Sequence, residues 1–195
     1  VIEDLAIDGN RENNPHLGGC RGGGILLYRA HGTQIRRVLV DGYHGDGISY
    51  QQSDDVLVED CTVRRCSHLG LHPGSGSQRT IVRRCRLHGN GSIGLFLCWR
   101  VRHSRFEGND IFENGVTGIS IGHKDSDNVF RHNTVARNGK YGVLFRNEPY
   151  VLAGHRNRFE QNRIVDNGND QEGYGFYIDG ETEGTEIVGN VIGNT

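Results

Sequence analysis

Short apolar segments alternate with polar turns along the whole chain, and the alternation returns at a nearly constant interval. A glycine followed by an apolar, a variable and usually another apolar residue recurs with spacings of 23, 23, 24, 24, 24 and 33 residues. The seven copies start at Gly24, Gly47, Gly70, Gly94, Gly118, Gly142 and Gly175. Segments this short, with inward and outward positions alternating, indicate β-strands rather than helices. The pattern therefore predicts stacked strands, one from each repeat.

A second apolar position stands twelve residues before five of these glycines. Its members are Ile35, Val58, Val82, Phe106 and Phe130. Phe159 continues the column but lies sixteen residues before Gly175, so the spacing changes there. We expect insertions around residues 147–154 and 169–172. Loops inserted on one face of a repeat protein often border its binding surface.

Asparagines and charges follow the same period. One predicted column contains Cys61, Cys85, Asn109, Asn133, Asn162 and Asn190, and another contains Cys66, Asn90, Asn114, Asn138 and Asn167. Asparagines stacked at a corner can hydrogen-bond the coils above and below, and the glycine column is expected to supply corners with φ > 0. The residue after each apolar anchor alternates in sign: Arg36, Glu59, Arg83, Glu107, Arg131 and Glu160. Opposite charges on neighbouring strands favour this register.

A period near 24 residues is typical of one coil of a parallel β-helix, with strands about 4.8 Å apart. In this pattern residues 22–195 resemble the right-handed parallel β-helix proteins of the pectate-lyase-like superfamily. The resemblance implies an all-β solenoid and right-handed coiling. We expect one domain over residues 1–195, with regular coils from about residue 22, forming a section of a longer rod. The last apolar rung has no recognisable cap, so end-to-end self-association is one expectation.

Composition narrows the classes of protein. Thirty glycines disfavour a helical bundle, and 34% hydrophobic residues give no run long enough for a membrane-spanning helix. A net charge of −2 gives no general attraction for nucleic acid. Cys61 and Cys85 should be stacked neighbours, either as a disulfide or as buried thiols. The family resemblance implies a secreted or cell-envelope protein.

Unusual side chains collect on and beside the strands that follow the glycines. The candidate substrate-binding residues there are His44, His68, Phe96, Trp99, Tyr141, Tyr177 and Asp179. Aromatic rings cover the apolar faces of sugars, while charged and amide groups bind hydroxyls and carboxylates. The alternative is that the aromatic residues merely favour strand formation. We expect an acidic polysaccharide as partner.

The first hypothesis for activity is a lyase or C5-epimerase on a uronate polysaccharide. Such an enzyme needs a base to remove the proton next to the carboxylate and a cation to neutralise that carboxylate. His72 and His123 are the candidate bases, and Lys124 and Arg146 are the candidate cations. Arginine is suited to bidentate carboxylate binding.

Two other functions stay open. The segment Asp46-Gly47-Ile48-Ser49-Tyr50 is similar to the Asn-Thr-Asp-Gly-Ile-Asp-Ile segment of polygalacturonases, which implies a hydrolase with Asp46 as one carboxylate and Asp125 or Asp179 as the other. However, Ser67-His68-Leu69-Gly70 stands where that family has paired aspartates. The third function is a non-catalytic glycan-binding or fibre-forming rod.

Metal sites receive little support from the spacing. In an extended strand His68 and His72 would lie about 13 Å apart, which discourages a zinc site. Calcium, common among β-helix lyases by resemblance, would need clustered oxygens. The available carboxylates, Asp46, Asp125, Glu148 and Asp179, are scattered along the sequence. The sequence therefore predicts no metal site with certainty. Calcium is the one cofactor that the resemblance allows.

Overall fold

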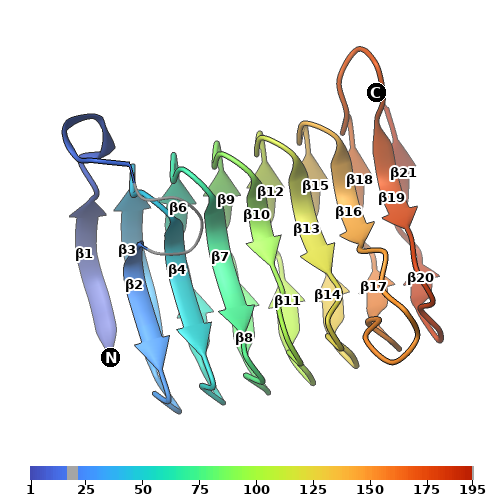
Figure 1. Ribbon diagram of the computed structural model, residues 1–195, viewed down its shortest axis with the longest axis horizontal. Coiled ribbons are helices and arrows are strands. Elements are labelled where there is room, and N and C mark those ends of the chain that lie inside the picture. Colours follow the sequence, from blue (N-terminus) through green and yellow to red (C-terminus); the bar gives the residue numbers. More distant parts are fainter. Residues whose placement is uncertain (17–21, 195) are drawn as a thin grey trace.

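A computed structural model describes residues 1–16 and 22–194, and these form a rod of stacked coils (Figure 1). Strands of successive coils pair in parallel, and each regular coil contributes three strands. The predicted all-β parallel solenoid with about 24 residues in each coil is confirmed. The termini lie at opposite ends of the rod.

Three faces run along the rod. Sheet 1 contains β2 (Gly23–Tyr28), β4 (Asp46–Gln51), β7 (Leu69–Gly74), β10 (Ile93–Phe96), β13 (Thr117–Ile121), β16 (Tyr141–Phe145) and β19 (Tyr174–Ile178). The long strand β3 (Gln34–Asp41) joins the other two faces, because its first half pairs with β5 (Leu57–Glu59) and its second half with β6 (Thr62–Arg64). Sheet 2 continues through β5 (Leu57–Glu59), β8 (Ile81–Arg83), β11 (Arg105–Glu107), β14 (Val129–Arg131), β17 (Arg158–Glu160) and β20 (Glu186–Val188). Sheet 3 continues through β6 (Thr62–Arg64), β9 (Arg86–His88), β12 (Asp110–Phe112), β15 (Thr134–Ala136), β18 (Arg163–Val165) and β21 (Val191–Gly193).

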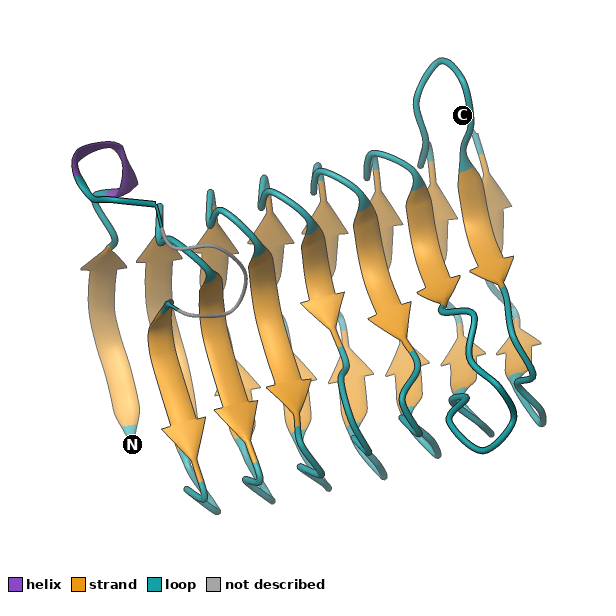
Figure 2. Ribbon diagram, viewed as in Figure 1, coloured by secondary structure: helices purple, strands orange, loops and turns teal. Residues whose placement is uncertain are grey.

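An additional strand, β1 (Ile2–Asp8), pairs in parallel with β3 at the N-terminal end of the rod. The sequence pattern did not indicate it, because β1 lacks the glycine signature and most of its side chains are exposed. A short 3₁₀ turn, η1 (Arg11–Asn13), follows it (Figure 2). Within residues 1–16 and 22–194, no helix has the length and apolar character needed to cross a bilayer.

The apolar anchors form the interior of the rod. Those of sheet 2, from Ile35 to Phe159, have no exposed surface. Phe130 stacks on Phe106 at a ring-centroid distance of 4.8 Å and on Phe159 at 4.5 Å. Burial of these columns is the main favourable contribution to folding, because each fully buried large apolar side chain contributes roughly 1.5–3 kcal/mol.

Both predicted asparagine columns are confirmed as hydrogen-bonded ladders. Asn114 accepts a bond from the Asn90 backbone N–H and donates to Asn138 Oδ1 at 2.9 Å, and Asn133 is placed in the same way in the other column. A third ladder of mixed residue types was missed: Thr80, Ser104, Asn128 and Asn157. These ladders satisfy buried backbone groups at the corners, which would otherwise destabilise a rod with so many turns.

The expected role of the glycine column was wrong. None of its seven members has φ > 0, and the left-handed corners are occupied mostly by other residues, such as Arg65 and Glu113. A Cβ atom at Gly94 would lie 2.6 Å from Asn114 Nδ2 and 2.6 Å from Ile111 Cγ2. A ladder asparagine likewise fills the space that a Cβ would need at Gly70, Gly118 and Gly142, whereas core side chains such as Val40 and Ile192 fill it at Gly24 and Gly175.

The charged column on sheet 2 has the predicted register. Glu59 forms ion pairs with Arg36 at 3.3 Å and with Arg83 at 2.5 Å, and Arg131 pairs with Glu107 at 3.0 Å. The hydrogen bond from Arg83 is the main cause of the lowered pKa of Glu59. Neighbouring coils are thus held in register by charge as well as by the core.

Three further expectations concern the thiols, the insertions and the last rung. Cys61 and Cys85 are free thiols, which resolves the alternative left open by the sequence. The two insertions form the loops between β16 and β17 and between β18 and β19 (Figure 1). At the C-terminal rung, Ile187, Val188, Val191 and Ile192 are between 39% and 58% exposed. End-to-end association through this rung stays a prediction.

Candidate functional site

The variable residues of the glycine repeat line up as one column along sheet 1, as the strand register and a ring contact show. In order along the rod it contains Leu26, Ser49, His72, Phe96, Ser120, Leu144 and Tyr177. The side chains with the most chemistry gather in its middle coils, beneath and beside Phe96. They form two groups, one around His72 and one around Arg146.

Asp46 and His72 form the first group. Asp46 opens β4 and His72 lies within β7, one coil further along. The Asp46 residue is 2% exposed, and its Oδ2 atom lies 2.8 Å from His72 Nδ1. A carboxylate only accepts hydrogen bonds, so this contact places the imidazole proton on Nδ1 and leaves the lone pair on Nε2. No described residue bonds to Nε2, and an imidazole oriented in this way can act as a general base.

A pocket of about 300 Å³ opens beside this pair. It is lined by Gly22, Gly23, Leu26, Asp46, Ser49, Gln51 and His72. Gln51 donates to Ser49 Oγ at 2.9 Å and fixes the pocket floor. The Asp46 Oδ1 atom is buried and accepts no hydrogen bond from the described residues. Sequence reasoning missed Ser49 and Gln51 because isolated polar residues on a strand carry no motif.

His68 and His72 share a neighbour, the carboxylate of Asp46, which the strand spacing did not indicate. Its Nδ1 atom is 3.7 Å from Asp46 Oδ1, so both histidines face the same carboxylate. His68 lies in the turn directly before β7. The group of His68, Asp46 and His72 is therefore one cluster, and the histidines contact opposite oxygens of Asp46.

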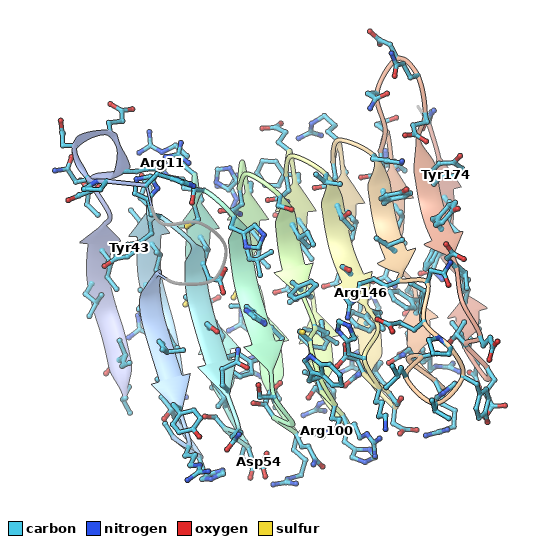
Figure 3. All side chains as sticks on the ribbon, viewed as in Figure 1. Arg11, Tyr43, Asp54, Arg100, Arg146 and Tyr174 are labelled. Carbon is cyan, nitrogen blue, oxygen red and sulfur yellow. The ribbon has the colours of Figure 1, made fainter. Side chains whose placement is uncertain are left out.

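Arg146 is the centre of the second group (Figure 3). It follows β16, and its side chain reaches back across two coils, donating to Ser120 Oγ at 2.8 Å and to the Leu97 carbonyl at 2.9 Å. Its guanidinium carbon lies 4.7 Å from the centre of the Phe96 ring. His72 packs against the same ring, with 5.2 Å between centroids. Phe96 thus connects the imidazole of the first group with the guanidinium of the second.

His123 is held at both ring nitrogens. Arg146 donates to its Nδ1 at 3.2 Å, and its Nε2 lies 2.8 Å from Glu148 Oε1. Because a guanidinium only donates, Nδ1 is the acceptor and Nε2 carries the proton. The ring also stacks on Trp99, with 4.7 Å between centroids and 4° between planes. His123 therefore has no unoccupied nitrogen, and of the two candidate bases His72 has the better geometry.

Burial controls the electrostatics beneath Arg146. Asp125 has no exposed surface, and burial raises its pKa to about 7 against the opposing effect of Val101 N–H, Arg146 and Gly122 N–H. Burial also lowers the pKa of Arg146 and, together with the Arg146 charge, that of His123. The pKa of the Cys98 thiol is raised by burial to about 11. Because the Asp125 carboxyl is partly protonated near neutral pH, it compensates only part of the Arg146 charge.

The remaining candidates lie in other places. Tyr141 and Tyr177 form a cluster with Tyr174 on β16 and β19, with ring centroids 5.0–5.7 Å apart. Asp179 follows this cluster, and its Oδ1 accepts the Gly180 N–H. His44 lies away from the pocket, because its Nε2 contacts the Arg11 and Asn14 carbonyls in the N-terminal loop.

Lys124 lies in the turn after β13, next to His123. Its backbone N–H donates to the Leu152 carbonyl. The structure therefore brings Asp46, His68, His72 and Phe96 together, and separately His123, Arg146 and Trp99, whereas His44 is outside both groups.

The carboxylates offered for calcium do not converge. Asp46 faces His72, Asp125 faces Arg146 and Glu148 faces His123. Among residues 1–16 and 22–194, no three His, Cys, Asp or Glu side chains could hold one metal ion. The donor set therefore does not fit a resident calcium ion, and no step of the proposed chemistry is assigned to one.

Residues 23–192 match the family model described as right-handed β-helix region. The chain belongs to this family. That match confirms the right-handed coiling, which strand spacing by itself leaves open. No protein of curated function matches the sequence.

Several solved structures share the fold. The periplasmic alginate epimerase AlgG is 14% identical, with a TM-score of 0.70 over 87% of this chain and 48% of its own. The A-module of the Azotobacter vinelandii mannuronan C-5 epimerase AlgE6 is 20% identical, with a TM-score of 0.72 over 85% of this chain and 51% of its own. The pectate lyase Pel9A is 16% identical, with a TM-score of 0.53 over 72% and 44%. This chain spans about half the length of these proteins, and identities this low show a common fold.

Proposed function

We propose that this β-helix acts on an acidic polysaccharide by removing the proton next to a uronate carboxylate, with His72 as the base. The observation that carries the proposal is the imidazole held at Nδ1 by buried Asp46, at the wall of a pocket of about 300 Å³, with no residue of 1–16 or 22–194 bonded to Nε2. The proton leaves the sugar carbon for Nε2, and Asp46 stabilises the imidazolium that forms. Asp46 is then a positioning residue rather than an acid.

Negative charge moves onto the sugar carboxylate when the proton leaves, so a nearby cation would stabilise the transition state. Arg146 supports this role because its guanidinium packs on the same Phe96 ring as His72. Its Nε–H is buried and has no acceptor among the described residues. The raised pKa of Asp125 leaves the guanidinium more of its charge for a substrate carboxylate.

Epimerase and lyase reactions share this first step and differ in the second. An epimerase returns a proton to the opposite face of the carbon, whereas a lyase expels the neighbouring glycosidic oxygen and forms a double bond. The names of the structural neighbours include both reactions. A polysaccharide substrate also favours a location outside the cytoplasm, and one neighbour is named as periplasmic.

The tyrosine cluster supports binding of a chain longer than one sugar. Tyr141, Tyr174 and Tyr177 lie on sheet 1, the face that carries His72, and Tyr174 is 39% exposed. Lys140 lies 4.9 Å from the centre of the Tyr141 ring and forms an ion pair with Glu172. Aromatic rings of this kind can cover sugar faces several coils away from the base.

The test detects both outcomes of one proton abstraction. Alginate, polymannuronate and polygalacturonate are incubated with the protein in D₂O, with and without calcium. NMR then detects deuterium at C5, and absorbance detects an unsaturated product. We expect exchange on at least one polymer, and a loss of roughly 10²–10⁴-fold in His72→Gln. Asp46→Asn should lose about 10–100-fold.

His132→Gln is the matched control, because His132 is exposed at a corner between sheets 2 and 3. It should retain full activity. The proposal would be overturned if no polymer showed either exchange or an unsaturated product. Equal rates in the parent and His72→Gln would exclude His72 as the base.

A non-catalytic glycan-binding rod is the second candidate. One solved neighbour is a tailspike protein, 18% identical with a TM-score of 0.63 over 72% of this chain and 31% of its own. Oligouronate binding without turnover, unchanged in His72→Gln, would favour this function. Hydrolysis has less support, because Asp125 is fully buried and Asp46 faces His72. New reducing ends without unsaturated product would favour it instead.

A further inference from the structure

Trp99 occupies a turn where its backbone conformation is unfavourable. Trp99 and Arg100 have φ values of 69° and 64°, and His123 and Lys124 have 47° and 66° in the next coil. Left-handed conformations cost bulky residues about 1–2 kcal/mol each. In the preceding coil the same positions are held by Ser75 and Gly76.

One face of the indole is covered and the other is open. The indole stacks on His123 with a centroid distance of 4.7 Å, close to the spacing of about 4.8 Å between coils. The two rings are therefore stacked along the rod axis. The second indole face is on the side of the preceding coil, where Ser75, whose N–H bonds to the Cys98 carbonyl, holds the position equivalent to Trp99. Trp99 remains 42% exposed.

A cation borders the same open space. Arg100 Nε lies 4.0 Å from where a Cβ of Gly76 would be, so the Arg100 side chain lies over the Ser75–Gly76 step. Arg100 is exposed and has no ion-pair partner among the described residues. In Figure 3 it lies at the turns below Arg146. Lys124 holds the equivalent position one coil further on. The step is therefore bordered by an indole face and a free guanidinium.

The platform is rigid before any ligand arrives. His123 supports the indole from behind, and both His123 nitrogens are bonded, to Arg146 and to Glu148. Preorganised aromatic surfaces bind with a smaller loss of side-chain entropy. Phe96, which contacts His72, ends β10 three residues earlier in the same chain segment.

We propose that the Ser75–Gly76 step, bordered by Trp99 and Arg100, is a binding subsite for an acidic sugar. The indole face covers the apolar face of the ring, and the guanidinium binds its carboxylate. The subsite rests on the proposed function for its substrate class, but it is separate from the base. A uronate chain bound here would reach the His72 pocket within a few sugar units and would be held in one direction.

Fluorescence gives a direct test, because Trp99 is the only tryptophan in the sequence. Trimers of galacturonate, mannuronate and guluronate are titrated separately, with maltotriose as the neutral control. We expect a saturable change of emission with at least one acidic trimer, weakened by salt, and none with maltotriose. The change should persist in His72→Gln, because the subsite does not contain the base.

Four variants locate the ligand. Arg100→Gln should weaken binding about fivefold to tenfold, and Trp99→Phe, followed by calorimetry, should weaken it less than Trp99→Ala. Ser75→Tyr, which fills the space against the indole, should abolish the fluorescence change. Arg163→Gln is the matched control, since Arg163 is exposed on sheet 3, and should bind like the parent.

The outcomes separate the subsite from the proposed function. If acidic trimers bind or react but leave Trp99 emission unchanged, or if Trp99→Ala and Arg100→Gln bind like the parent, the subsite is wrong. If emission changes as expected while no C5 exchange occurs on any polymer, the subsite holds and the proposed catalysis is wrong. If no acidic trimer binds by fluorescence or calorimetry, the subsite is also overturned.

Discussion

Replacing Asp125 with asparagine removes a buried carboxyl while keeping the shape of its side chain. The parent carboxyl has no exposed surface, accepts bonds from the Val101 and Gly122 N–H groups, and lies 3.4 Å from Arg146 Nη2. Burial raises its pKa from 3.8 to about 7. The folded protein therefore binds this proton more tightly than the unfolded chain does.

The size of the effect depends on the difference in pKa. A shift of about three units corresponds to about 4 kcal/mol, at 1.36 kcal/mol for each unit. Below about pH 4 the carboxyl is protonated in both states. Between about pH 4 and pH 7 the unfolded chain ionises first, so the free energy of unfolding of the parent falls. The asparagine variant lacks this pH dependence. The free energy of unfolding of the parent, relative to that of Asp125→Asn, should therefore fall by about 4 kcal/mol between pH 4 and pH 7.

Urea unfolding followed by circular dichroism measures both proteins at several pH values from 4 to 7.5, with refolding checked at each. Asp127→Asn is the matched control. The pKa of Asp127 is lowered, chiefly by its hydrogen bond from Arg156. The stabilisation from ionised Asp127 is present above the unfolded pKa and is lost only as the pH falls below about 4. The difference in free energy of unfolding between the parent and Asp127→Asn should therefore be constant from pH 5 to 7.5.

A parent-minus-variant difference for Asp125→Asn that stays constant or rises between pH 4 and 7 would refute the reasoning. It would mean that Asp125 is ionised in the folded protein and fully paired with Arg146. The charge available on Arg146 for a substrate carboxylate would then be smaller than we infer, and the neutralising role proposed for Arg146 would lose its support.

Three other results are expected. Asn114→Ala should lower the free energy of unfolding by about 3 kcal/mol in urea, because Asn90 loses its partner in the ladder; a loss below 1 kcal/mol would contradict this. Gly94→Ala should cost about 1–3 kcal/mol through overpacking against Asn114, whereas Gly89→Ala, at φ 63° with nothing within 4 Å, should cost about 1 kcal/mol through backbone strain alone. Cys98, with a pKa of about 11, should react slowly with iodoacetamide at pH 8 and rapidly once unfolded, as judged by peptide mapping; equal rates would show an exposed thiolate.

Part of the site was predictable because the repeat fixes it. Once Ser49, His72 and Phe96 occupy the variable position after the glycine, their common outward column is a consequence of strand alternation. Asp46 and His72 are 26 residues apart, one coil plus a short step along the strand, so their proximity could have been inferred from the period. The same period does not tell how far Arg146 reaches, because a long side chain can extend back across two coils to Leu97.

The sequence alone determined the fold: a 24-residue period of apolar, glycine and asparagine positions is satisfied when identical positions stack, since each coil completes the hydrogen bonds of the next. Tertiary structure decided the chemistry. It showed that the glycine column makes room for the ladders and that Asp125 is buried. It also showed that His123 is bonded at both nitrogens, whereas no described residue bonds to His72 Nε2. These properties depend on side-chain direction and desolvation, which residues from several coils set together and which no single repeat encodes.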